Sequence, residues 1–347
     1  MPQPQDAPTP APAGATAAGP ATPPPTEATD RGVALRARLQ QLLAFAGLIV
    51  ISVIFAVANP VFASFSNITT VLFSAVVIGT LALGTTFVIV TGGIDLSIGT
   101  GMALCAVMAG QFITNWGIPW PLGVVLTLLF GALMGAINGS LVALLRLPPF
   151  IATLAMMLVA QGLALVISHV SPIYFDIKSG YVKLSTGELI PKIPNAVLIY
   201  LLAAIIAAVV LAKSVLGRYT FAMGSNEDAT ALSGIPVARW KIAVYTFAGI
   251  FTALAGILIS ARLGSAQPAT GQGYELYAIA AVVIGGTSLT GGKGSILGTV
   301  IGSLIIAVIQ NGLQLLSFPQ PWQLVILGSV ILLAVYADMA RKRPGTH

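Results

Sequence analysis

The sequence predicts an all-α integral membrane protein with about ten transmembrane helices, and three observations lead to this prediction. The 347 residues are 56% hydrophobic and only 7% charged, whereas soluble domains carry about 25% charged residues. The mean hydropathy is +0.95. Long apolar runs recur along the chain. A soluble globule is therefore excluded, because most of these residues need a lipid bilayer as their solvent.

Ten apolar runs are candidates for membrane-spanning helices. They occupy residues 42–58, 68–90, 98–114, 122–145, 150–170, 196–212, 242–261, 276–289, 296–316 and 322–337. The run at 276–289 is shorter than the roughly 20 residues that a perpendicular span needs, so we expect a short or broken helix there. Residues 56–58 resemble a signal-peptide cleavage site, but the length of the run and of the segment before it favours a retained helix.

Basic residues predict the orientation of the chain. With ten crossings and a cytoplasmic N-terminus, all of the 16 Lys and Arg residues lie inside except Lys178, Lys183, Lys192 and Arg262. If the run at 276–289 does not cross, the basic residues after it move outside. The excess of cytoplasmic over external Lys and Arg residues then disappears. The positive-inside rule therefore favours ten crossings with both termini in the cytoplasm.

Composition divides the chain into three regions. Residues 1–30 are rich in Pro and Ala and predict a disordered cytoplasmic tail, because they cannot bury enough apolar surface to fold. Residues 31–340 form the transmembrane domain, with an external loop at 171–195 and a cytoplasmic loop at 213–241. Residues 341–347 form a basic cytoplasmic tail.

Groups that carry catalysis or bind metals and nucleotides are scarce. The single cysteine, Cys105, lies in an apolar run, and the two histidines are far apart, so we expect no catalytic residue, disulfide or metal site. The stretch 286–295 lacks the Gly and Ser/Thr positions of a phosphate-binding loop, so we expect no cofactor on this chain. The net charge of +6 is explained by membrane topology, and no nucleic-acid partner is expected. A buried ion relay is nearly absent, which argues against an ion-driven carrier.

Polar residues within or beside the runs are candidates for a translocation path. They are Asp95, Ser97, Asn138, Gln161 and Asn311. Asp95 follows two glycines and either caps the next helix or serves the path. The amides either bind a transported molecule or hydrogen-bond to neighbouring helices.

Small residues at four-residue spacing predict close contacts between helices. Gly131, Gly135 and Gly139 form one such series, and Gly298 with Gly302 repeats the spacing. Backbones approach closely where side chains are absent, so these glycines indicate helix packing rather than ligand binding.

The loop at 213–241 contains a complete short helix, predicted at 227–233. Asn226 or Ser225 can cap its first amides, Glu227 and Asp228 suit the positive end of the helix dipole, and Gly234 suits the C-terminal turn. Its small apolar residues fit a docking groove on a partner. The alternative is an amphipathic helix on the lipid surface, for which little bulky apolar area is available.

Three motifs together resemble the permease subunits of ribose-type sugar ABC importers, within the branched-chain permease superfamily. They are Gly-Gly-Ile-Asp-Leu-Ser-Ile-Gly at 92–99, Gly-Arg-Tyr-Thr-Phe-Ala-Met-Gly-Ser-Asn at 217–226 with its following helix, and the Gly-rich stretch at 281–295. The resemblance extends over residues 42–337, and Ser225 stands where a second glycine is common. It implies that the ATPase-coupling residues are Gly217, Arg218, Gly224, Asn226, Glu227, Asp228, Ala231 and Gly234.

The resemblance also implies partners and a location. It implies a multi-pass protein of the bacterial inner membrane without ATPase activity, paired with an identical or related permease chain. Two cytoplasmic subunits would bind ATP and Mg, and a periplasmic sugar-binding protein would deliver the cargo. The loop at 171–195 either docks that protein or is simply solvated. Ribose, xylose, galactose, fructose and inositol stay open as cargo, and the alternatives are a branched-chain amino acid permease or an ion-coupled secondary carrier.

Overall fold

The computed structural model describes residues 27–342, which are mostly helical. The chain divides into two compact units, Met1–Arg38 and Leu39–His347. Of the first unit, only the beginning of helix α1 (Glu27–Ala58) is described, and it includes the last four residues of the predicted tail. The rest of that tail and residues 343–347 lie outside the described range.

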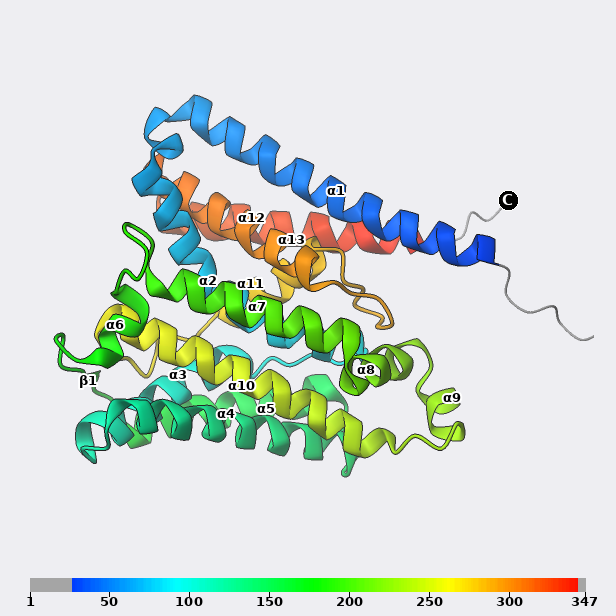
Figure 1. The fold of residues 1–347 in the computed structure, drawn as a ribbon, viewed down its shortest axis with the longest axis horizontal. Coiled ribbons are helices and arrows are strands. Elements are labelled where there is room, and N and C mark those ends of the chain that lie inside the picture. Colours follow the sequence, from blue (N-terminus) through cyan, green and yellow to red (C-terminus); the bar gives the residue numbers. More distant parts are fainter. Residues whose placement is uncertain (1–26, 343–347) are drawn as a thin grey trace, which may run out of the picture. The chain divides into compact units, whose positions relative to one another are not determined.

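In its described residues, the second unit contains twelve further α-helices (Figure 1). The long ones are α2 (Phe65–Val90), α4 (Trp120–Ala143), α5 (Pro149–Ile167), α7 (Asn195–Lys213), α10 (Val237–Leu263), α12 (Ile296–Leu315) and α13 (Gln320–Lys342). The shorter ones are α3 (Ile98–Gly110), which continues as a π-helix (Gln111–Asn115), α6 (Gly180–Thr186), α8 (Val215–Ser225), α9 (Glu227–Leu232) and α11 (Tyr274–Ile284). A 3-10 turn, η1 (Pro60–Ala63), precedes α2.

Each of the ten predicted runs coincides with one of these helices, so the prediction of an all-α membrane protein is confirmed. Seven helices in the described part of the chain are long and apolar enough to cross a bilayer. The apolar portions of α1 and α13 are shorter, as is α11. The number of ten crossings and the positions of the termini remain predictions.

Helix α2 lies in the interior of this unit. In its most apolar stretch 89% of residues are buried, against 22% in α4 and in α5. A helix that is apolar around its whole circumference needs apolar neighbours on every side, which here are α7, α10, α11 and α12. The outward faces of α4 and α5 instead expose residues such as Leu129 and Val166, as a lipid-facing surface requires.

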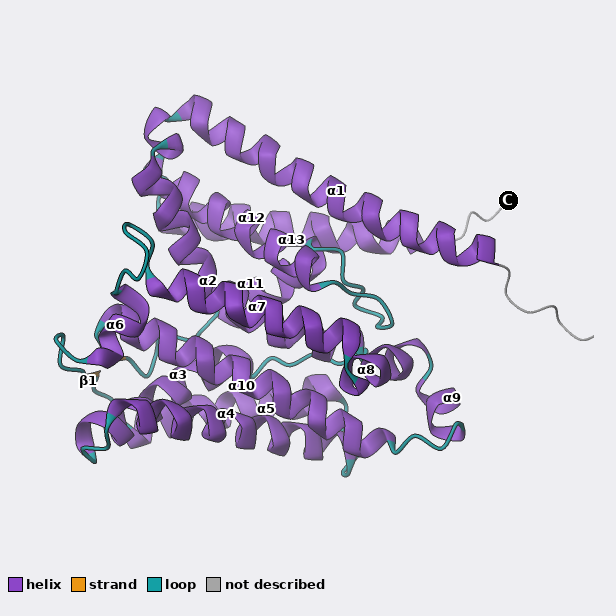
Figure 2. Cartoon of the chain, in the orientation of Figure 1, coloured by secondary structure: helices purple, strands orange, loops and turns teal. Residues whose placement is uncertain are grey.

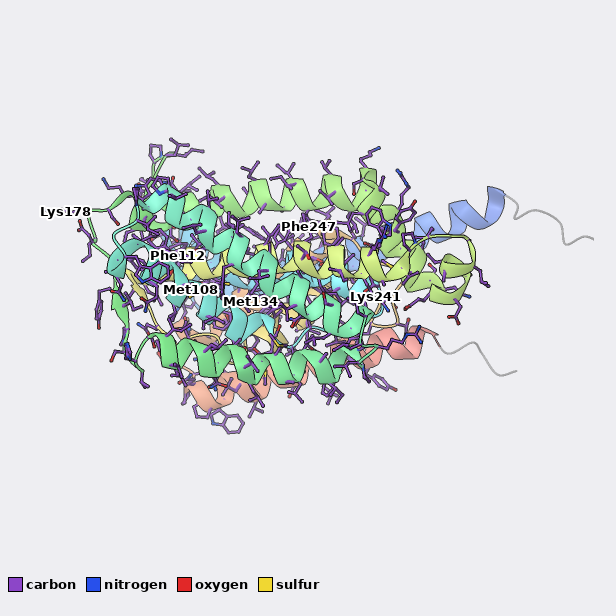
Figure 3. The ribbon with its side chains drawn as sticks, turned by 90° about the horizontal axis from the view of Figure 1, so that it is seen from below. Met108, Phe112, Met134, Lys178, Lys241 and Phe247 are labelled. Carbon is purple, nitrogen blue, oxygen red and sulfur yellow. The ribbon has the colours of Figure 1, made fainter. Side chains whose placement is uncertain are left out.

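The loops gather mainly at two opposite ends of the helices. Lys178 and Lys241 mark these ends in Figure 3. At the first lie α6 and a two-stranded antiparallel ribbon of β1 (Ile173–Tyr174) and β2 (Ser265–Ala266). At the second lie α8 and α9. We refer to them as the α6 end and the α8 end.

Helices α3 and α11 begin midway between these two ends. The Thr100 hydroxyl, in the first turn of α3, donates to the Met157 carbonyl in the middle of α5 at 2.9 Å. A Cβ at Gly99 would overlap the Gly271 carbonyl and Glu275 Oε2, so the first turn of α11 lies directly against that of α3. With 11 residues, α11 rises only about 16 Å, roughly half of the hydrocarbon core. The two short helices therefore start at the same depth and run toward opposite ends.

Glycines with positive φ determine where helices α11 and α2 end. Helix α11 ends at Ile284, five residues before the end of the predicted run, because Gly286 adopts φ +90°. Gly92, with φ +80°, likewise follows the end of α2. Both conformations are unfavourable for residues with a Cβ. After α2 the chain returns from the α8 end into the bundle as the loop 91–97, and Figure 2 shows loop in teal between the helices.

Candidate functional site

The sharp turn between α7 and α8 depends on two small residues. Ser214 caps α8, with its hydroxyl accepting a hydrogen bond from the Gly217 amide at 3.1 Å. A Cβ at Gly217 would overlap the Leu211 carbonyl. Because Gly217 has no side chain, α8 folds back tightly against the end of α7.

The short helix predicted from the sequence is α9, and its ends match the prediction within one residue. Asn226 Oδ1 accepts a hydrogen bond from the Ala229 amide at 2.9 Å, as an N-cap should. Glu227 and Asp228 occupy the first turn, and Gly234 adopts φ +81° after the last turn. All predicted coupling residues from 226 to 234 are exposed, and so is Leu232, at 89%. Helix α9 thus presents a rigid, uncovered surface at the α8 end.

An ion pair joins α9 to the start of α10. Lys241 Nζ lies 2.7 Å from Glu227 Oε2. The Lys241 side chain is 16% exposed and that of Glu227 48% exposed, so solvent screens the pair and it adds at most about 1 kcal/mol of stability. The pair links the first turn of α9 to the beginning of α10.

Segments from the three sequence motifs meet at the α8 end. The Gly292 amide donates to the Val90 carbonyl at 2.9 Å, which joins the loop after α11 to the end of α2. Gly224, near the end of α8, packs on both groups, because a Cβ there would overlap the Val90 carbonyl and lie 2.6 Å from the Gly292 amide. We call Val90, Gly224 and Gly292 the glycine junction. A displacement of α8 therefore acts directly on the end of α2, where the loop to α3 begins, and on the loop that joins α11 to α12.

The loop from Thr91 to Ser97 carries the polar cluster that includes three of the predicted path residues. Asp95 Oδ1 accepts from the Ser97 amide at 2.9 Å and from the Ser97 hydroxyl at 2.7 Å. Asn138 Nδ2 of α4 donates to the Ser97 hydroxyl at 2.7 Å. All three side chains are buried, and Asn138 Oδ1 has no partner among the described residues. Ser97 stands at the N-cap position of α3, but its hydroxyl makes no capping bond.

Two buried residues that sequence reasoning missed support this loop. The Thr153 hydroxyl of α5 accepts from the Leu96 amide and lies 3.1 Å from the Ile94 carbonyl. The Tyr245 hydroxyl is buried without a partner in the described part of the chain, and a Cβ at Gly93 would lie 2.7 Å from it. The sequence signal for such a residue is a hydroxyl inside an apolar run. Because apolar runs of this chain contain many threonines, that signal does not single out one of them.

The other two predicted path residues lie away from this cluster. Asn311 of α12 and Asn67 of α2 exchange two side-chain hydrogen bonds, of 2.9 and 3.0 Å. Both residues are buried, so this pair links two helices in the way that interhelical amides do. Gln161 is half-buried on α5.

The predicted packing glycines lie at two close helix contacts. A Cβ at Gly131 would overlap Ala253, one at Gly135 would overlap the Tyr245 carbonyl, and one at Gly139 would lie 2.7 Å from the Ile242 Cα. The α4 series thus faces α10. Gly298 and Gly302 of α12 lie against the carbonyls of Gly285 and Ala281 in the same manner.

Residues 67–335 match the family described as the branched-chain amino acid transport system, permease component. The chain belongs to this family. It is 45% identical to the ribose import permease protein of Bacillus subtilis over 86% of this chain and 93% of the relative. It is 41% identical to the ribose import permease protein of Escherichia coli K12, over 87% and 95% of the two chains. The fructose import permease protein of Rhizobium meliloti is 38% identical over 80% and 79%. No solved structure gives a significant match.

The three motifs that carried the resemblance all lie inside the region that this permease family shares. Membership in the family confirms the resemblance to sugar import permeases that the motifs predicted. The described side chains contain no group of three or more His, Cys, Asp or Glu residues that could hold a metal ion.

Proposed function

We propose that this chain is the membrane permease of a binding-protein-dependent ABC importer for a monosaccharide or polyol. Relatives that match most of its length are named import permeases for ribose, xylose and fructose. These names favour sugar over the branched-chain amino acids of the family description. The chain itself holds no phosphate-binding loop, so ATP and Mg belong to two partner subunits in the cytoplasm.

The glycine junction is the observation that carries the coupling role. Exposed, capped α9 provides a docking surface for an ATP-binding subunit, and α8 connects it to Gly224. Through Val90 and Gly292, movement of α8 reaches the end of α2, where the loop to α3 begins, and the loop that joins α11 to α12. ATP-driven closure of the partner subunits would thereby shift the loops that border the path, which is a form of alternating access.

The remaining assignments follow from this function. The α8 end is cytoplasmic, the α6 end faces the periplasm, and the ten helices cross the bacterial inner membrane with both termini inside. A second permease chain completes the path, and a periplasmic binding protein docks at the loop 171–195. Asp95, Ser97, Asn138 and Gln161 stay candidates for residues along the path, whereas Asn311 pairs with Asn67.

Uptake of radiolabelled ribose, xylose or fructose by membrane vesicles tests this proposal. We expect uptake to require ATP, the partner ATPase and a binding protein. Uptake by this chain alone in response to an ion gradient would contradict the proposal and favour a secondary carrier.

Two variants test the coupling segment. Glu227→Gln and Gly234→Ala are expected to hydrolyse ATP with uptake reduced at least tenfold, while the chain still inserts. Gly264→Ala is the matched control, because Gly264 has φ +64° and open space around it like Gly234 but lies at the end of α10. Normal uptake by both coupling variants would remove α9 from the mechanism.

A further inference from the structure

A half-buried arginine lies near the α6 end without a carboxylate partner. The Arg262 guanidinium, in the last turn of α10, stacks on the Phe73 ring at 4.1 Å and donates to the Phe73 carbonyl at 3.2 Å. Among the side chains that the structure describes, no carboxylate lies within salt-bridge distance of it. Phe73 is the ninth residue of α2, so the guanidinium reaches inward from the end of α10. A charge held at this depth without a counter-ion indicates a functional role, since burial of a charge costs several kcal/mol.

Two tyrosines lie one turn apart at the start of α11. The rings of Tyr274 and Tyr277 are 6.2 Å apart and meet edge to face, and both side chains are half-exposed. The neutral phenol of Tyr274 lies within electrostatic range of the Arg262 guanidinium. Gln272 and Leu276 of the same turn are exposed in the single chain. This turn is therefore exposed on the surface of the single chain.

A buried acceptor completes the group. Glu275 is 9% exposed, its Oε1 accepts from the Gly273 amide at 3.1 Å, and its Oε2 has no hydrogen-bond donor among the described residues. That oxygen lies against Gly99, where the first turns of α3 and α11 meet. Tyr277 lies within electrostatic range of the same carboxylate. Arg262, Tyr274, Tyr277 and Glu275 thus form a continuous series from the end of α10 to mid-depth.

We propose that Arg262, Tyr274, Tyr277 and Glu275 form a contact site for a neutral, polyhydroxylated molecule on its way through the permease. Aromatic rings offer flat apolar faces with a polar tip, which suits the C–H face of a sugar ring. The guanidinium has donors to spare and the tyrosine hydroxyls both donate and accept, so together they can satisfy several hydroxyls above the buried Glu275 carboxylate. This proposal rests on the proposed function, because it names the residues that the sugar meets.

Cysteine substitution tests whether the site borders an aqueous path. Cys105, the one native cysteine, is fully buried, so the background is low. In spheroplasts that contain the complete transporter, a membrane-impermeant thiosulfonate is added from outside to Tyr274→Cys and Tyr277→Cys. Tyr336→Cys, on the exposed apolar face of α13, is the lipid-facing control. We expect both site variants to react, and added ribose with binding protein to slow the reaction at least threefold.

Transport by arginine variants tests sugar contact separately. Arg262→Gln is expected to lower ribose uptake at least tenfold with ATP hydrolysis within twofold of wild type, and Arg262→Lys to recover part of the uptake. If Tyr274→Cys and Tyr277→Cys stay as inert as Tyr336→Cys while wild-type uptake is intact, the site is wrong and the proposed function stands. If wild-type transporter takes up none of ribose, xylose and fructose, the sugar assignment and the proposed function both fall.

Discussion

The amide of Gly292 donates a hydrogen bond to the carbonyl of Val90, 202 positions earlier in the chain, at 2.9 Å. The bond joins the end of a buried helix to the loop that leads into α12. Gly224 fills the remaining space beside it, so three segments distant in sequence share one contact point. Because helices α2 and α12 are both largely buried, a force applied at this junction reaches the interior of the bundle.

We expect Gly224→Ala to destabilise the protein by about 1–3 kcal/mol, the usual range for overpacking. The added Cβ would overlap the Val90 carbonyl, and backbone cannot move aside as a flexible side chain can. Thermal unfolding in detergent measures the effect. Gly162→Ala is the control, since that helical glycine on α5 has nothing within 4 Å. Equal melting temperatures for the two variants would show that α8 does not pack on the junction.

The pairing of Asn67 with Asn311 predicts that Asn311 acts in stability rather than in transport. Asn311→Leu leaves the buried Asn67 Oδ1 without a donor, while Asn67 Nδ2 keeps the Phe62 carbonyl, and the change is expected to cost about 1–3 kcal/mol. The double variant Asn67→Leu/Asn311→Leu removes both polar groups and should recover part of that loss. Uptake per folded transporter is expected to stay within twofold of wild type. A large loss of uptake in a stably folded variant would instead place Asn311 on the path.

The contact between Gly135 and the Tyr245 carbonyl predicts a strong dependence on residue size. Gly135→Ala is expected to lower stability by about 1–3 kcal/mol, because α4 must move away from α10. Gly328→Ala on α13, where nothing lies within 4 Å, should have little effect. The comparison of the two melting temperatures checks the prediction, and similar values would show that the α4–α10 contact is looser than described.

Asp95→Asn should lower the stability of the protein less than Asp95→Leu. Its Oδ1 accepts two bonds from Ser97, and Asp95→Asn retains an oxygen at that position. Asp95→Leu leaves buried donors of Ser97 unpaired, with an expected cost of about 1–3 kcal/mol. Thermal unfolding of the two variants gives the answer. An equal loss in both would mean that the negative charge matters more than the hydrogen-bond geometry.

Sequence patterns predicted the helices well because each signal was local. The cap at Asn226, the acidic first turn and Gly234 located α9 within one residue. The ten apolar runs each located a helix. For α11 the pattern overestimated the length, because apolar residues continue past Ile284 while Gly286 ends the helix through its positive φ.

The path candidates show where sequence reasoning stopped. Asp95, Ser97 and Asn138 are separated by up to 43 positions yet form one hydrogen-bonded cluster. Asn311 of α12 instead hydrogen-bonds to Asn67 of α2. Each of these residues is a polar side chain within or beside an apolar run, so the sequence pattern alone does not distinguish their roles. Which partner an amide finds depends on the rotation and crossing of its helix, and those are settled by contacts with other helices.

Composition and periodicity alone determined the membrane class, the helical segments and the short capped helix, because these follow from the solvent and from residues within a few turns of each other. The tertiary structure alone decided that α3 and α11 begin at the same depth, that Gly224 and Gly292 of two motifs meet at Val90, just before the third motif, and that Arg262 stacks on Phe73. These relationships depend on close packing between residues more than a hundred positions apart in several cases, where the absence of a Cβ at a single glycine sets how near two backbones can come.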